Sequence, residues 1–152
     1  MWGVWMPGFL QFLTGTYLLL GLTVFRVFGS GDGTTPLYMA AVAFTAYSVH
    51  WFALGHRRFI RANASPDGWM AIPFLALSAL GAIVFFHVSD WPVGVLFVGL
   101  SLVYLTEVVA RLGRVAAANR GVAFWQLLTG LWLMYLTYAT VLNLAVGFSW
   151  KL

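Results

Sequence analysis

Long apolar runs separated by short polar breaks dominate this chain. A helix rises about 1.5 Å per residue, so roughly 20 apolar residues are needed to cross the roughly 30 Å hydrocarbon core of a bilayer. Five runs have about this length, at residues 7–28, 36–55, 69–88, 92–110 and 121–147. We therefore predict an all-α integral membrane protein, with one transmembrane domain over residues 1–152 built from five membrane-spanning helices.

Too few charged side chains are present to cover a water-facing surface. Charged residues make up 8% of the chain and hydrophobic residues 62%, whereas a soluble domain carries about 25% charged residues. The chain contains no cysteine, which excludes disulfides, thiolate metal sites and a cysteine nucleophile. The arginines lie beside apolar runs and not on a soluble basic face, so we expect the lipid bilayer as a partner and no nucleic acid.

Arginines indicate the orientation of the predicted helices. Two loops are rich in arginine, one with Arg57, Arg58 and Arg61 and the other with Arg111, Arg114 and Arg120. Loops with many lysines and arginines stay in the cytoplasm, and a count of five helices puts these two loops on the same side. We therefore predict a cytoplasmic N-terminus and a C-terminus outside, in a bacterial plasma membrane. Residues 1–6 carry no basic residue, so we expect the first run to remain as a helix and not to be removed as a signal.

The first and fifth runs share a short motif. Phe-Leu-Gln-Phe-Leu-Thr-Gly at residues 9–15 matches Phe-Trp-Gln-Leu-Leu-Thr-Gly at residues 124–130 at five of seven positions. One interpretation is an ancestral parallel repeat. The other is that two helices both use small residues for close packing, as membrane helices commonly do. In the second interpretation the helix-packing residues are Thr14, Gly15, Thr129 and Gly130.

Two ionisable residues lie inside predicted spans, near their cytoplasmic ends. His50 is five residues before the end of the second run, and Glu107 is three residues before the end of the fourth. Each follows a tyrosine three residues earlier, Tyr47 and Tyr104, which lies on the same helix face. An ionisable group at the middle of a membrane helix costs about 2.5–3.5 kcal/mol on insertion scales. Each of the two residues therefore needs a reason for its position.

Two interpretations of these residues remain open. In the functional one, His50 and Glu107 form a polar gate or a proton-sensitive pair at the inner mouth of a pore. In the structural one, both side chains snorkel to the interface or pair with Arg57 and Arg111. Aromatic rings can narrow a pore, although packing against lipid or other helices explains most aromatic residues equally well. The candidates for such constrictions are Phe44, Tyr47, Trp51, Tyr104, Trp125, Trp132 and Tyr135.

The sequence gives no indication of an enzyme, a haem or a metal site. Glu107 is the only glutamate, and no paired carboxylates or nucleophile motif accompany it. His50 is expected on the inner side and His87 near the outer side, so these two histidines cannot face each other across a haem. We therefore predict a protein without catalytic residues, cofactor or bound metal.

Three segments resemble the acetate uptake transporters of the SatP/YaaH type. Ala-Phe-Thr-Ala-Tyr-Ser-Val-His-Trp at residues 43–51 resembles their Ala-Phe-x-Ser-Tyr-Gly-x-Phe-Trp segment. Gln-Phe-Leu-Thr-Gly at residues 11–15 resembles their Gln-x-x-Ala-Gly segment, and Leu-Leu-Thr-Gly-Leu-Trp-Leu-Met-Tyr at residues 127–135 resembles the Leu-Leu-Thr-Ala…Tyr of their last helix. The related urea/amide channels of the AmiS/UreI type are similar in layout. The resemblance implies a homo-oligomer, a hexamer, with a small-solute pore through each protomer.

The chain also departs from these families. Both have six helices, whereas the five runs here correspond to the last five, and the Asn-Pro-x-Pro-Leu-Gly motif of the acetate family is absent. The motifs favour the acetate transporters, but the Arg-rich loops agree with the orientation of the urea/amide channels. Two function hypotheses follow. One is an oligomeric channel or transporter for urea, a short amide or acetate, and the other is a non-catalytic membrane subunit of a larger complex.

Overall fold

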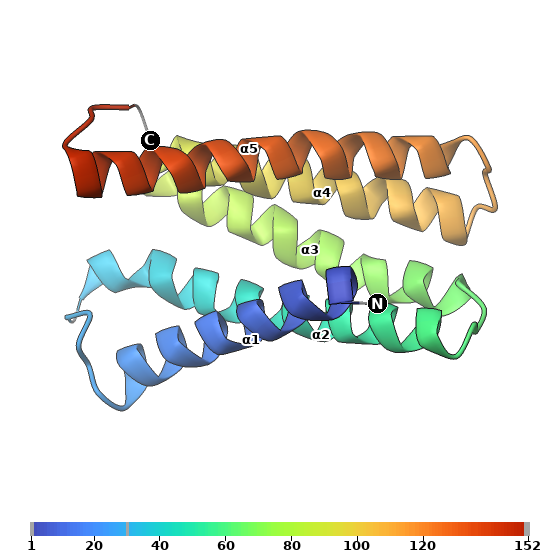
Figure 1. Cartoon of the computed structure of the whole chain (residues 1–152), viewed down its shortest axis with the longest axis horizontal. Coiled ribbons are helices and arrows are strands. Elements are labelled where there is room, and N and C mark those ends of the chain that lie inside the picture. Colours follow the sequence, from blue (N-terminus) through green and yellow to red (C-terminus); the bar gives the residue numbers. More distant parts are fainter. Residues whose placement is uncertain (1, 30, 151–152) are drawn as a thin grey trace. The chain divides into compact units, whose positions relative to one another are not determined.

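The computed structural model describes residues 2–29 and 31–150 of the chain. Within these residues the structure is helical and contains no strand, which confirms the predicted all-α class. Figure 1 shows the order of the elements, which are α1 (Trp2–Thr23), the short 3-10 helix η1 (Asp32–Thr34), α2 (Thr35–Phe59), α3 (Ser65–His87), α4 (Trp91–Arg111) and α5 (Ala118–Val146). Four of the described helices, α2 to α5, are long and apolar enough to cross a membrane.

The first helix begins and ends earlier than the predicted range 7–28. α1 ends at Thr23, and Arg26 then adopts a φ of 50°, in the left-handed region that turns the chain. Phe28 packs back on Tyr17, with ring centroids 5.6 Å apart. The apolar run extends past the end of the helix because its last residues belong to this turn.

The loop between α2 and α3 is shorter than predicted. α2 continues to Phe59, four residues past the expected end at residue 55, and α3 begins at Ser65. The segment Ser-Pro-Asp-Gly at residues 65–68 has a composition that predicts a turn outside a helix, but it forms the first turn of α3. Proline suits this position because the first turn of a helix needs no N–H partner. The Asn63 side chain supports the helix start by accepting a hydrogen bond from the Ser65 backbone N at 3.0 Å.

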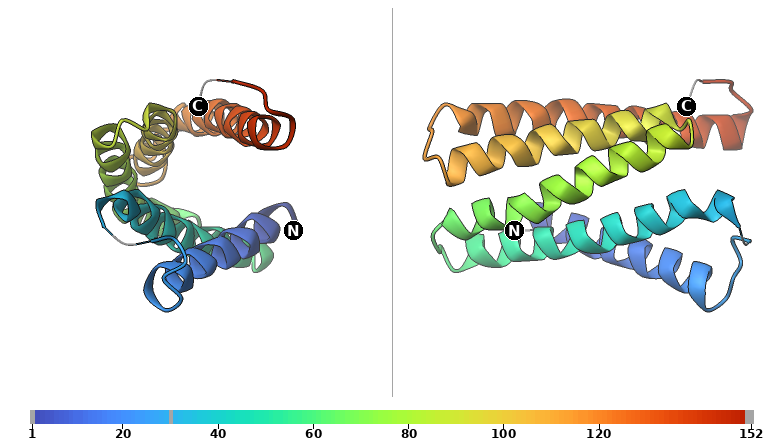
Figure 2. Two further views of the ribbon diagram at one scale, coloured as in Figure 1. Left: turned by 90° about the vertical axis from the view of Figure 1, so that its left-hand side faces the viewer. Right: turned by 180° about the vertical axis from the view of Figure 1, so that it is seen from behind.

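The chain forms two compact units, residues 1–70 and residues 71–152, with the boundary near the start of α3. In the first unit α1 packs along α2, and in the second α4 packs along α5. Figure 2 shows both helix pairs. Of the polar candidates, His50 therefore belongs to the first unit and Glu107 to the second.

Small residues on α1 allow its close approach to α2. A Cβ atom added to Gly15 would lie 2.9 Å from the Thr45 backbone N and 3.2 Å from the Ala41 carbonyl oxygen. One added to Gly8, two turns earlier, would lie 3.1 Å from the Trp51 Cβ. Membrane helices that meet through small residues gain van der Waals contact over their whole length, so the glycines set the spacing of this pair.

Aromatic rings fill the space between α3 and α4 in the second unit. Phe97 of α4 lies against Gly81 of α3 and stacks on Phe85, with ring centroids 5.3 Å apart. Further along, Phe74 of α3 stacks on Tyr104 of α4 at 5.4 Å. Stacked pairs of this kind add about 0.5–1.5 kcal/mol beyond the area that they bury, and they fix the face of α4 that points inward.

Candidate functional site

The two ionisable residues expected inside spans are buried within their units. His50 of α2, in the first unit, is 5% exposed, and Glu107 of α4, in the second unit, is 4% exposed. The tyrosines one turn earlier are buried with them, Tyr47 at 7% and Tyr104 at 5%. This burial differs from the interpretation in which both ionisable side chains snorkel to the membrane interface, because a snorkelling side chain keeps its polar end in water.

Arg57 and Arg111 each bind a partner that was not predicted from the sequence. Arg57 Nε lies 2.8 Å from a carboxylate oxygen of Asp67, and Asp67 is buried in the first turn of α3. Arg111 Nη1 donates a hydrogen bond to Asn119 Oδ1 at 3.0 Å. The Arg57–Asp67 pair thus joins the end of α2 to the start of α3. It was missed because the segment that contains Asp67 was expected to be a turn.

Hydroxyl groups accompany His50 on α2. Ser48, which is fully buried, donates from Oγ to the Thr45 carbonyl oxygen at 2.6 Å. Thr45 in turn donates from Oγ1 to the Ala41 carbonyl oxygen at 2.8 Å. Such bonds to the helix's own backbone satisfy the hydroxyl donors and let them be buried at little cost. The interior of the first unit therefore combines a histidine, a tyrosine and two hydroxyls.

The second unit also contains buried polar side chains on α3 and α4. Ser78 of α3 is fully buried and donates from Oγ to the Phe74 carbonyl oxygen at 2.7 Å. Tyr104 stacks on the Phe74 ring one helical turn before Glu107. The ring pairs Phe74–Tyr104 and Phe85–Phe97 show that α3 and α4 run in opposite directions. Ser78 and Glu107 therefore lie on opposite sides of the Phe74–Tyr104 stack, each one turn away from it.

The remaining aromatic candidates lie at less buried positions. Phe44 and Trp51 are half-buried on α2, and the Trp51 ring packs edge-on to His50 with centroids 6.3 Å apart. Tyr135 is half-buried on α5 and stacks on Trp132 at 5.3 Å. Trp51 is thus a constriction candidate whose ring lies against a buried ionisable residue.

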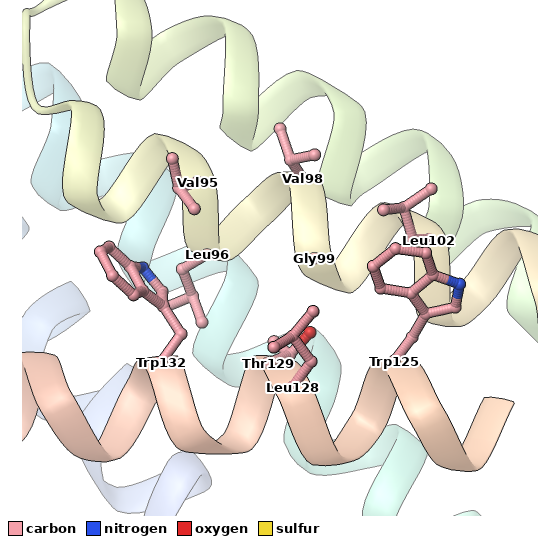
Figure 3. Close-up of a pocket in the computed structure, with 9 residues that line it drawn as sticks. All are labelled: Val95, Leu96, Val98, Gly99, Leu102, Trp125, Leu128, Thr129 and Trp132. Atoms are coloured by element: carbon pink, nitrogen blue, oxygen red, sulfur yellow. The ribbon is translucent and has the colours of Figure 1, made fainter. Parts of the chain in front are cut away.

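An apolar groove of about 140 Å³ lies between α4 and α5 in the second unit. Figure 3 shows Trp125 and Trp132 at its two ends, with Gly99 and Thr129 between them. Its lining residues are Val95, Leu96, Val98, Gly99, Leu102, Trp125, Leu128, Thr129 and Trp132. Three of these residues, Trp125, Thr129 and Trp132, are candidates that the sequence predicts. The groove itself was not predicted, because it depends on Gly99 of a different helix.

Among the described residues, no group of three or more His, Asp or Glu side chains is placed to hold a metal ion.

Comparison of the chain with protein-family models, with curated proteins and with solved structures finds no match.

Proposed function

We propose that this chain is an integral membrane channel or transporter for a small uncharged or weakly acidic solute, such as urea, a short amide or acetate. The observation that carries the proposal is the burial of His50 and Glu107 inside helical units with largely apolar outer surfaces. Ionisable residues that face the interior of a membrane protein commonly belong to substrate or ion pathways. The resemblance of residues 43–51 and 127–135 to acetate transporters supports the same conclusion and extends it to a homo-oligomer.

The buried polar groups favour solutes of low charge. Among the described residues the buried polar or charged side chains are Ser48, His50, Asp67, Ser78, Glu107 and Thr129, without a lysine or an arginine. Moving an anion out of water without a paired cation costs far more than moving a hydrogen-bonded neutral group. A neutral amide, urea or the undissociated form of a short acid therefore fits these interiors better than a carboxylate.

The orientation that we propose is five spans with the N-terminus in the cytoplasm and the C-terminus outside. It places the Arg-rich segments after α2 and α4 on the cytoplasmic side. Because the natural chain has no cysteine, single cysteines can report the orientation directly. We expect a membrane-impermeant maleimide to label Gly33→Cys in intact cells and to label Ala62→Cys only after lysis. Labelling of Ala62→Cys in intact cells would show that the orientation is reversed.

Uptake of labelled urea, acetamide and acetate into proteoliposomes tests the function. We expect uptake above that of empty liposomes for at least one solute. His50→Ala and Glu107→Gln are each expected to lower it by about tenfold, since a polar contact inside a membrane protein contributes about 1–2 kcal/mol and 1.4 kcal/mol is a factor of ten. The control is His87→Ala, because His87 is exposed at the end of α3. Uptake equal to that of empty liposomes for all three solutes would exclude this function.

A second candidate is a non-catalytic subunit of a larger membrane complex. The observation that favours it is the open face around Gly130 on α5, where an added Cβ would meet nothing within 4 Å. The flanking residues Leu127 and Leu131 are exposed, and a small residue between large apolar ones is a common contact point for a partner helix. Gentle purification separates the candidates. A ring of identical chains supports the channel, whereas fixed heterologous subunits support the second candidate.

A further inference from the structure

The Thr129 hydroxyl differs from the other described threonine hydroxyls of α5. Thr137 and Thr140 donate to the carbonyl oxygens of Leu133 and Leu136, one turn back, at 2.9 and 2.8 Å. Thr129 is only 8% exposed, and its Oγ1 atom is buried without a hydrogen-bond partner among the described residues. A buried hydroxyl without a partner costs free energy, so its position at the floor of the groove calls for a partner from outside the chain.

The floor of the groove is built around this hydroxyl. A Cβ atom on Gly99 would lie 2.5 Å from Thr129 Oγ1, so the hydroxyl occupies space that any other residue at position 99 would fill. Thr129 is itself a lining residue of the groove, so a molecule in the groove lies beside its side chain.

One end of the groove is preformed. Trp132 is held in place by a hydrogen bond from its Nε1 to the Pro92 carbonyl oxygen at 2.9 Å and by stacking on Tyr135. Trp125 lies seven residues earlier on the same helix, about 10.5 Å along its axis. Aromatic walls around a few polar groups are typical of small-molecule sites, and the two indole rings set the length of the guest.

Size and charge restrict the guest further. The groove, which is open on one side, has a volume of about 140 Å³, close to that of the apolar cavity of about 150 Å³ that accepts benzene, with its six carbons. None of its lining residues carries a charge, so an ion there would lose its hydration without compensation. The hydroxyl donates one proton and therefore matches an acceptor oxygen on the guest.

From these features we infer that the groove between α4 and α5 binds an uncharged planar carbonyl compound of up to about six non-hydrogen atoms. The carbonyl oxygen accepts a hydrogen bond from Thr129, and the apolar end lies between Trp125 and Trp132. A short amide and an undissociated short carboxylic acid share this chemistry. The inference rests on the proposed function, because it names the site and the charge state of the solute.

Binding of propionamide to the purified protein in lipid nanodiscs tests the inference, with saturation-transfer NMR on the ligand as the readout. We expect saturable binding that Thr129→Val, which removes the donor but keeps the shape, weakens about five- to tenfold. Thr129→Ser keeps the donor and is expected to bind like the natural protein. The matched control is Thr137→Val, which removes a hydroxyl that is already bonded within α5. If Thr129→Val does not fold, Trp125→Leu provides the second variant, and it should also weaken binding.

Several results would overturn the inference. Unchanged affinity for propionamide in Thr129→Val would show that the groove is not the binding site. Where that variant fails to fold, unchanged affinity in Trp125→Leu would show the same. Propionate binding at neutral pH as tightly as propionamide would contradict the requirement for an uncharged guest. Binding in detergent that disappears in nanodiscs would show that lipid chains fill the groove. Binding of propionic acid, measured below its pKa, compares the undissociated acid with the amide. Equal binding of the two compounds would show that the groove recognises the carbonyl group that they share. Binding of neither compound would overturn the inference.

Uptake measurements separate this inference from the proposed function. Normal uptake by Thr129→Val together with unchanged binding would reject the groove and leave the channel intact. Saturable binding that depends on Thr129, without uptake of any solute, would keep the groove and reject the channel.

Discussion

Replacing Gly15 with valine is expected to lower the free energy of unfolding by about 3 kcal/mol, the upper end of the range for overpacked sites. The added side chain would meet the Thr45 backbone N and the Ala41 carbonyl oxygen, at 2.9 and 3.2 Å from its Cβ. Backbone atoms cannot rotate away as a side chain can, so α1 and α2 must separate. The better helix propensity of valine recovers only a few tenths of a kcal/mol, which is too little to offset the loss.

Gly130 provides a matched control, because it occupies the same motif position as Gly15 and nothing lies within 4 Å of its added Cβ. We expect Gly130→Val to change the free energy of unfolding of the isolated chain by less than about 0.5 kcal/mol, as for other sites without close neighbours. Both variants can be compared by helicity during titration of mixed micelles with sodium dodecyl sulfate. Equal destabilisation by the two substitutions would contradict the close packing of α1 on α2.

The helices could be predicted from the sequence because each one needs a long apolar segment and each loop needs polar residues. Their ends were harder to place. Phe28 is apolar, yet it follows the turn at Arg26 and packs back on Tyr17. Pro66 indicated a turn but lies in the first turn of α3, where proline is equally suited. A hydropathy pattern indicates which side chains avoid water. The end of a helix depends instead on backbone angles, which the hydropathy pattern does not report.

The environments of the two shared motifs could not be predicted from their sequence. Residues 9–15 and 124–130 are nearly identical, but Gly15 lies against α2 while the face around Gly130 is open. The difference comes from the neighbouring helix and not from the motif. Likewise, residue spacing gave the shared face of Tyr104 and Glu107, whereas the groove at Thr129 required Gly99 from another helix.

Asp67→Asn is expected to destabilise the first unit by about 3 kcal/mol, the lower end of the range for breaking a buried ion pair. Asp67 is almost fully buried, and its carboxylate lies 2.8 Å from Arg57 Nε. The substitution keeps the shape of the side chain but leaves the guanidinium without its counter-charge. Because the Arg57 side chain is 19% exposed, water screens part of the loss, and the upper end of the range is not reached. Thermal loss of helicity in a mild detergent measures the effect.

Asp90→Asn is the matched control for this substitution. Asp90 is also an acidic residue at a helix start, where it accepts a hydrogen bond from the Val93 backbone N at 3.3 Å. Asparagine caps helices about as well as aspartate, so this variant should melt within a degree or two of the natural protein.

A double variant separates the ion pair from other roles of Asp67. Replacing both partners, with Arg57→Gln and Asp67→Asn together, removes the two charges at once and leaves neither uncompensated. Buried pairs replaced as a whole commonly cost much less than one partner removed alone. We therefore expect the double variant to be more stable than Asp67→Asn, with a coupling free energy of about 1–3 kcal/mol. If the double variant loses as much free energy of unfolding as Arg57→Gln and Asp67→Asn lose in sum, the link between α2 and α3 does not depend on the pairing of Arg57 with Asp67.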